Sequence, residues 1–151
     1  MKVYLASDHA GFDLKETIKN FVQKEQYSVE DLGTHSGESV NWAEYGARAA
    51  RMVSKNPRET RGILICGSGI GMSMIANKFK DIRAALCHNS YTAKMSRKHN
   101  NANILTLGAR ILKPDQALNI VKIWLNTPFE GGRHQDRLDY MHQIIEKQNF
   151  K

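Results

Sequence analysis

Residues 62–73, Gly-Ile-Leu-Ile-Cys-Gly-Ser-Gly-Ile-Gly-Met-Ser, constrain the fold of this chain more than any other segment. The apolar run at 63–65 is typical of a strand that is buried on both faces of a parallel sheet. Glycines at 67, 69 and 71 follow, and residues 72–78 are predicted to form a helix. A strand that turns through glycines into a helix leaves backbone N–H groups free at the positive end of the helix dipole. The segment therefore predicts a place to hold an anion.

Strand-like and helix-like segments alternate along the rest of the chain. Further strands are predicted at 2–7, 27–32, 83–87 and 104–107, and further helices at 12–25, 42–53, 90–98, 114–125 and about 133–148. This alternation predicts one α/β domain over residues 1–151, a three-layer α/β/α sandwich that is Rossmann-like, with a five-stranded, mostly parallel sheet. Ligands of such folds bind at the carboxyl ends of the strands, where we expect Asp8, His9, Cys66, Gly67 and Gly108.

Net charge leaves the class of partner open. The chain carries 22 Lys and Arg against 15 Asp and Glu, a formal charge of +7. Such a balance suits nucleic acid, but the basic residues are spread out and form no run of five. A small phosphorylated substrate explains it equally well.

Targeting and metal signals are absent from the sequence. No apolar stretch approaches the ~20 residues that span a bilayer, and the N-terminus lacks a signal-peptide layout. The two cysteines, Cys66 and Cys87, both end predicted strands and make a poor disulfide framework. Without a Cys-x-x-Cys or His-x-x-x-His pair we expect no metal site. These features predict a cytoplasmic protein.

The glycine pattern fits neither of the common nucleotide-binding motifs. A dinucleotide fingerprint needs Gly-x-Gly-x-x-Gly after the first strand and an acidic residue about 20 positions on. Here Gly-x-Gly-x-Gly follows the third strand, and no Walker-type Lys-Ser or Lys-Thr follows it. The glycines either cradle an anion or only permit close packing of a helix on a strand.

Cys66 and three histidine or aspartate positions are candidate acid–base groups. The helix dipole would favour the thiolate of Cys66, although a free cysteine is often only a small buried apolar residue. Asp8 and His9 form either an oriented acid–base pair or a loop that satisfies its own turn. His99, at the end of a predicted helix, is either a solvated helix cap or a general acid–base group.

Three arginines are candidate phosphate ligands. Arg133 and Arg137 share a helical face near a helix start, where cations are unfavourable, so an anion would compensate them. Two guanidinium groups can hold a phosphate, and Arg110 is a third candidate. The alternative is a solvated basic surface.

Taken together, these motifs resemble the ribose-5-phosphate isomerase B family of the ribose/galactose-6-phosphate isomerase superfamily. The resemblance covers nearly the whole chain. It rests on residues 7–11, 62–73, 76–78, 96–103, 108–110 and 130–137.

The resemblance implies a role for each site residue. Cys66 looks like the base that moves a proton between C1 and C2, Ser68 assists proton traffic between the two oxygens, and His99 opens the furanose ring. Backbone amides of Gly67, Gly69, Ile70 and Gly71 look like the cradle for the enediolate oxygens. The substrate contacts implied are Asp8, His9, Asn100, Arg110, Arg133 and Arg137.

The resemblance also implies a class of partner. It indicates a homodimer, with a tetramer possible, whose active sites draw residues from both subunits, and the helix at about 133–148 could pack on the partner. It implies a sugar phosphate substrate in the pentose phosphate pathway, with no metal or other cofactor, no nucleic acid and no membrane.

One departure affects the substrate. The family usually has Asp-Tyr-Pro where this chain has Asn41-Trp42-Ala43. Trp42 is larger than tyrosine and lacks the phenol, so the size of the sugar and its contacts at this position stay open. Allose 6-phosphate or galactose 6-phosphate is therefore an alternative substrate. The combination of Cys66 with His99 favours ribose 5-phosphate. A non-catalytic phosphosugar-binding module is the remaining alternative.

Overall fold

The computed structural model describes residues 1–148 and contains one five-stranded sheet in the order β2-β1-β3-β5-β4. Every pairing is parallel, so the predicted Rossmann-like sheet is confirmed. The strands are β1 (Lys2–Ser7), β2 (Ser28–Asp31), β3 (Thr60–Cys66), β4 (Ala84–Leu86) and β5 (Ile104–Gly108). The central strand β3 carries the apolar run that the sequence singles out.

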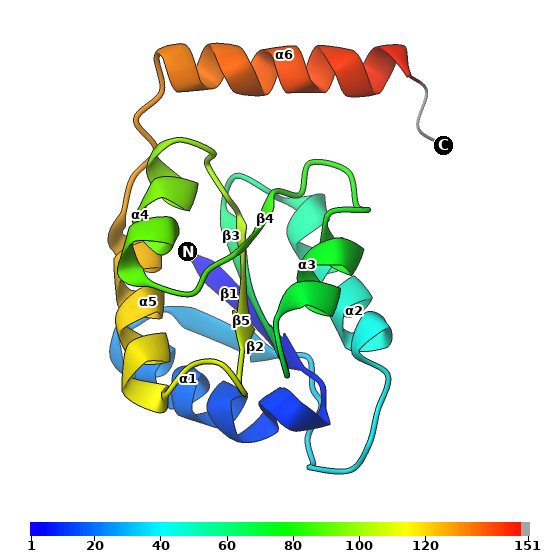
Figure 1. Cartoon of the computed structure of the whole chain (residues 1–151), viewed down its shortest axis with the longest axis vertical. Helices are drawn as coiled ribbons and strands as arrows, with labels where there is room; N and C mark the ends of the chain where they lie inside the picture. The colour runs from blue at the N-terminus through cyan, green and yellow to red at the C-terminus, as the bar shows by residue number, and fades with distance from the viewer. Residues whose placement is uncertain (149–151) are drawn as a thin grey trace.

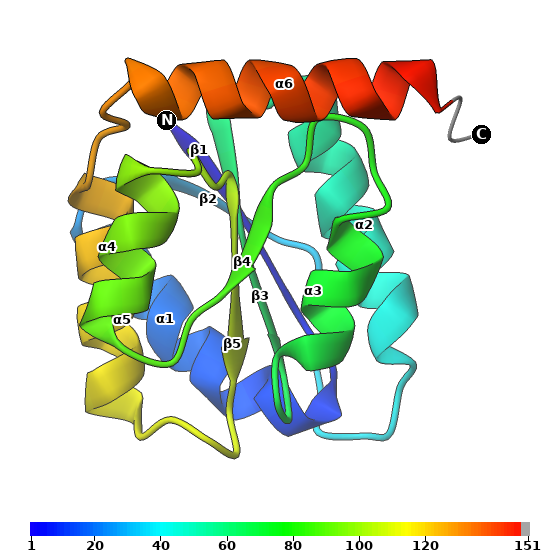
Figure 2. The same ribbon diagram turned by 45° about the horizontal axis from the view of Figure 1, so that its top comes forward.

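Helices cover both faces of this sheet, which gives the predicted three layers (Figure 1). The helices are η1 (His9–Gly11), α1 (Phe12–Lys24), α2 (Trp42–Lys55), α3 (Ile70–Ala76), α4 (Ser90–Lys98), α5 (Pro114–Asn126) and α6 (Arg133–Lys147). Helices α1, α4 and α5 cover one face, and α2 and α3 cover the other. Helix α6 lies across the edge of the sheet at which the strands begin (Figures 1 and 2).

Alternating side chains of β3 enter two separate cores. Ile63 and Ile65 join the larger cluster beneath α1 and α5, whereas Leu64 and Cys66 join the smaller cluster beneath α2 and α3. All four side chains are at most 5% exposed, as expected of a central strand in a parallel sheet. Among residues 1–148, neither cluster contains a residue of α6.

Helix α3 begins two residues before the predicted position. The first helical hydrogen bond, from Ser73 N to Gly69 O at 3.1 Å, starts the helix at Ile70, and the Ser68 hydroxyl accepts from the Ile70 N–H at 3.3 Å. The helix ends at Ala76 because the amide of Asn77 turns back to the chain, donating to Ser73 O at 2.9 Å and Ala84 O at 3.0 Å. Within residues 1–148, none of the helices has the length and apolar character needed to cross a bilayer.

A buried ion pair fixes α1 to the end of β2. The ammonium group of Lys15, which is 0% exposed, lies 2.5 Å from Asp31 Oδ2, and Lys19 lies 2.8 Å from the same oxygen. Burial alone would raise the pKa of Asp31, but hydrogen bonds from Lys15, Lys19 and the Gly33 N–H hold that pKa at about 2. Together with Glu16, whose Oε1 lies 2.6 Å from Lys15 Nζ, the Asp31 carboxylate makes the buried ammonium group tolerable.

Candidate active site

The sulfur of Cys66 lies at the inner end of the glycine loop. Cys66 is the last residue of β3 and is 5% exposed, and its Sγ accepts a hydrogen bond from the Gly69 N–H at 3.1 Å. Gly69 has φ +79°, and a Cβ there would lie 2.6 Å from Leu86 Cδ1, so only glycine fits this turn. The loop thus points an amide at the sulfur, and a thiolate accepts such a bond more strongly than a thiol does.

Two of the backbone N–H groups that were predicted to bind an anion donate hydrogen bonds within the loop itself. The Gly69 N–H donates to Cys66 Sγ and the Ile70 N–H donates to Ser68 Oγ. Within residues 1–148 the N–H groups of Ser68 and Gly71 have no acceptor, so they can meet oxygens of a ligand. The Ser68 hydroxyl lies beside them.

Arg110 and Trp42 border the same loop. Hydrogen bonds from Ala109 N to Cys66 O (2.8 Å) and from Arg110 N to Gly67 O (3.0 Å) fasten the chain after β5 to the loop. A Cβ on Gly67 would lie 3.3 Å from Arg110 Nη1, and one on Gly71 would lie 2.9 Å from the Trp42 ring. The guanidinium group and the indole therefore both lie against the loop.

Asp8 and His9 lie at the end of β1, next to β3, but do not form an acid–base pair. Asp8 Oδ1 accepts from the Gly11 N–H at 3.1 Å and so caps η1. His9 Nδ1 accepts from the Val40 N–H at 3.2 Å, so the neutral ring carries its proton on Nε2. Of the two interpretations of this pair, the geometry supports the loop that satisfies its own turn, and His9 Nε2 has no hydrogen-bond acceptor within residues 1–148.

A second group of candidate residues gathers where α4 ends and α6 begins. The ring of His99 stacks on that of His134, with centroids 4.2 Å apart and planes 11° from parallel. Glu130 Oε2 lies 3.8 Å from His99 Nε2 and 3.6 Å from His134 Nε2, and Glu130 also pairs with Lys98. This arrangement fixes the direction of the half-exposed His99 ring.

Charge within this second group is mostly positive. Burial lowers the pKa of His134, and the neighbouring charges of His99, Arg133 and Arg137 lower it further. The hydrogen bond from Lys98 holds the pKa of Glu130 below its ordinary value. Arg133 and Arg137 are exposed and have no carboxylate within 4.0 Å among residues 1–148, which suits the predicted anion site.

Glu130 and His134 belong to this second group, although the sequence reasoning gave neither of them a role of its own. Their spacing of four residues across the start of a helix could have indicated that the two side chains lie close together. With His99 they place one ligand atom each within 4.8 Å of one another, and they are the set within residues 1–148 that could hold a metal ion. Because the two rings are nearly parallel, no ion can lie in both ring planes without one ring turning.

The two groups of residues lie at opposite edges of the sheet. Cys66 pairs with Gly108 where β5 ends, whereas His99 and the exposed Asn100 come just before Ile104, where β5 begins and pairs with Gly62. The four-residue advance from Gly62 to Cys66 spans about 13 Å of strand. Figure 1 shows the same separation, with α6 at the edge away from the turn between β3 and α3. Cys66 and His99 of one chain therefore cannot act on the same pair of carbon atoms.

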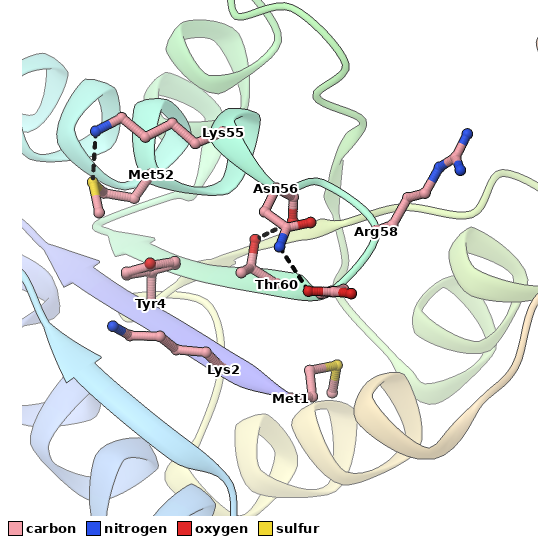
Figure 3. Close-up of a pocket in the computed structure, with 9 residues that line it drawn as sticks. Met1, Lys2, Tyr4, Met52, Lys55, Asn56, Arg58 and Thr60 are labelled. Carbon is pink, nitrogen blue, oxygen red and sulfur yellow. Dashed lines mark hydrogen bonds between the residues drawn. The ribbon is translucent and has the colours of Figure 1, made fainter.

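A large surface hollow is separate from both groups. It has a volume of about 710 Å³ and lies at the start of β1 and β3 and the end of α2 (Figure 3). Two pairs of its side chains contact each other, with Asn56 Nδ2 donating to Glu59 Oε2 at 2.8 Å and Lys55 Nζ lying 3.8 Å from Met52 Sδ. None of the predicted site residues lines it.

Known proteins are similar to this chain in sequence and in fold. The profile of the family described as Ribose/Galactose Isomerase matches residues 3–141. The structure of ribose-5-phosphate isomerase B from Clostridium thermocellum superposes with a TM-score of 0.94 at 48% identity, covering 99% of this chain and 100% of that chain. That of Mycoplasma genitalium ribose-5-phosphate isomerase B with bound ribulose-5-phosphate superposes with a TM-score of 0.93 at 38% identity, covering 99% and 97%. D-erythrulose-4-phosphate isomerase of Pectobacterium atrosepticum is 38% identical over 95% of this chain and 97% of its own length.

Proposed function

We propose that this chain, which belongs to the Ribose/Galactose Isomerase family and is an aldose–ketose isomerase, interconverts D-ribose 5-phosphate and D-ribulose 5-phosphate through a cis-enediolate. The observation that carries the proposal is the Cys66 sulfur, held 3.1 Å from the Gly69 N–H beside two amides that have no acceptor within residues 1–148. A base and free hydrogen-bond donors side by side are what proton abstraction next to a carbonyl requires.

In the proposed reaction the Cys66 thiolate removes the proton from C2 of the open-chain aldose. Negative charge then builds on the oxygens of C1 and C2, where the N–H groups of Ser68 and Gly71 donate hydrogen bonds. Donors of this kind contribute about 3 kcal/mol each when they are preorganised. The Ser68 hydroxyl transfers a proton between the two oxygens, and Cys66 returns its proton to C1 to give the ketose.

We infer that the active site is completed by a second copy of the chain. His99, Asn100, Arg133 and Arg137 of one copy would meet the glycine loop, Asp8, His9 and Arg110 of the other, because one chain holds these groups about 13 Å apart along the strands. His99 would then open the furanose ring, and the arginines would bind the phosphate. The homodimer is part of this proposal.

An uncovered apolar face on α6 supports the same assembly. Met141, Ile144 and Ile145 are 36%, 38% and 44% exposed and follow one another at helical spacing. We propose that the partner subunit covers them, as the resemblance implies for this helix.

Substrate length is a separate part of the proposal. Trp42 narrows the space above Gly71, which favours a five-carbon sugar phosphate over allose or galactose 6-phosphate. One relative is named for a four-carbon substrate, so a comparison should include D-erythrulose 4-phosphate. The proposed substrate pair belongs to the pentose phosphate pathway, and the cytoplasmic location stays a prediction.

Replacing Cys66 tests the proposal. Cys66→Ala should lower kcat for ribose 5-phosphate by about a hundredfold or more, because the base is lost while the fold is kept. Cys87→Ala is the matched control, since Cys87 is also buried at the end of a strand but its side chain joins the core cluster on the other face of the sheet from Cys66. Near-normal turnover in the Cys66 variant would remove this sulfur from the mechanism. A wild-type protein that binds ribose 5-phosphate without incorporating solvent deuterium at C2 would be a binding module instead.

A further inference from the structure

A second cavity lies beneath α6, at the edge of the sheet where the strands begin. It has a volume of about 460 Å³. Its walls come from the turn after α2, the starts of β3 and β4, the turn after α4, and α6. The lining residues are Pro57, Arg58, Arg61, Asp81, Arg83, Asn101, Gln135, Leu138, Asp139 and His142.

Guanidinium groups dominate this cavity, which we call the arginine pocket. Arg61 Nη1 donates to Thr60 O at 2.8 Å, and Arg83 Nε donates to Asn101 O at 3.0 Å. Within residues 1–148 the other nitrogens of Arg61 and Arg83 have no hydrogen-bond acceptor, and no carboxylate lies within 4.0 Å of either side chain. Both arginines therefore keep donors that have no acceptor in the described part of the chain.

Arg97 adds positive charge behind the pocket wall. Its side chain is 6% exposed and donates to Asn101 Oδ1 and Ala102 O, with no carboxylate within 4.0 Å in the described part of the chain. Burial and the charges of Arg61 and Arg83 lower the pKa of Arg97 to about 10. An anion bound between Arg61 and Arg83, with Arg97 behind them, would relieve the repulsion among these three guanidinium groups.

The acidic residues of the arginine pocket compensate this positive charge only in part, because burial lowers the pKa of Arg83 while the charge of Asp81 raises it. Asp139 accepts a hydrogen bond from Gln135 at 2.7 Å, and Asp81 lies more than 4.0 Å from the guanidinium groups. Their carboxylates are instead available to accept hydroxyl hydrogens. The pocket thus combines guanidinium groups that can bind an oxyanion with carboxylates that can accept hydrogen bonds from hydroxyl groups.

We propose that the arginine pocket binds a small phosphorylated, hydroxyl-bearing metabolite, with its phosphate group between Arg61 and Arg83. This site is separate from the proposed active site. It contains none of Cys66, His99, Arg133 and Arg137, and Gln135, Leu138 and Asp139 enter it from a different face of α6. A volume of 460 Å³ holds more than a phosphate ion, as pockets for metabolites do.

Equilibrium dialysis of the whole protein with radiolabelled inorganic phosphate, at constant ionic strength set with NaCl, tests this proposal. The wild type should bind two phosphates per chain, one in each site. Arg83→Gln should weaken one of the two sites by about tenfold or more, since a charged hydrogen-bond donor is lost. The kcat/KM for ribose 5-phosphate should not change in this variant.

Matched variants separate the two sites. The double variant Arg133→Gln/Arg137→Gln should lose the other phosphate and keep the one in the arginine pocket. Arg58→Gln, at an exposed lining residue, is a second probe that keeps the test valid if Arg83→Gln fails to fold. Arg51→Gln removes an exposed charge outside the pocket and should change neither site.

Two results would overturn the proposal. One is a single phosphate per chain that disappears in the Arg133→Gln/Arg137→Gln variant. The other is binding of two phosphates that neither Arg83→Gln nor Arg58→Gln weakens. Loss of turnover would concern the proposed function alone, because phosphate binding is measured without catalysis.

Discussion

Mixing two inactive variants gives the sharpest test of an active site shared between copies of the chain. Cys66→Ala removes the proposed base and His99→Asn removes the proposed ring-opening group. Each variant alone should be inactive, because every site then lacks one of the two groups. In a dimer of one chain of each variant, one site lacks both groups, whereas the other keeps Cys66 from one chain and His99 from its partner.

The expected recovery follows from the separation of the two groups. A shared site is required because about 13 Å of strand divides Cys66 from the end of the sheet where His99 lies. Random pairing of equal amounts makes half of the dimers mixed, and each mixed dimer has one intact site of two. The mixture should therefore reach about a quarter of wild-type activity in a symmetric two-fold dimer.

The assay is ribulose 5-phosphate formation after the two variants are unfolded together and refolded. Differently tagged chains and a pull-down verify that mixed dimers form. The control is a mixture of Cys66→Ala with the double variant Cys66→Ala/His99→Asn, which has no intact combination. If the first mixture forms mixed dimers but gives no more activity than its two components, the shared-site reasoning is wrong.

Three further predictions concern stability and substrate choice. Asp31→Asn should lower the free energy of unfolding at pH 7 by about 1–2 kcal/mol after allowance for solvent screening. Because the pKa of Asp31 is about 2, below its ordinary 3.8, this contribution is present above pH 3.8 and is lost as the pH falls toward 2. Urea melts should therefore show the variant and the wild type converging in acid, and a constant difference would contradict the assignment. Gly69→Ala should cost about 1–3 kcal/mol in thermal melts because of its φ of +79° and the contact with Leu86, whereas Gly37→Ala, with open space around it, should be neutral. Equal effects of the two would refute the strain argument. Trp42→Tyr should raise the ratio of kcat/KM for allose 6-phosphate to that for ribose 5-phosphate about tenfold, and an unchanged ratio would show that Trp42 does not select sugar length.

Short-range patterns predicted the sheet and the glycine loop. The apolar run of β3 and the glycines after it led to the correct central strand, and the strand ends brought Asp8, Cys66 and Gly108 to one edge as expected. The start of α3 was misplaced because the helix begins directly after Gly69, with the bond from Ser73 N to Gly69 O, and hydrophobic spacing does not indicate such a backbone contact.

Long-range contacts of the second group could not be predicted from spacing. His99 and His134 stack across 35 residues of sequence, and their contact depends on how α6 crosses the edge of the sheet. The order of helices and strands alone did indicate that the glycine loop and the His99 group lie at opposite ends of the strands. A residue that follows a helix in a parallel α/β fold lies where the next strand begins, so His99 and Asn100 had to lie away from Cys66.

The position of α6 outside both cores has a consequence for how such enzymes diversify. Neither core cluster within residues 1–148 includes a residue of this helix, and only His134 and Leu138 of it are buried. Substitutions along α6 can therefore accumulate without loosening the sandwich that holds the glycine loop. If the proposed site is correct, related sequences can vary the last helix, and with it the contacts to the phosphate, while the loop that holds Cys66 stays the same.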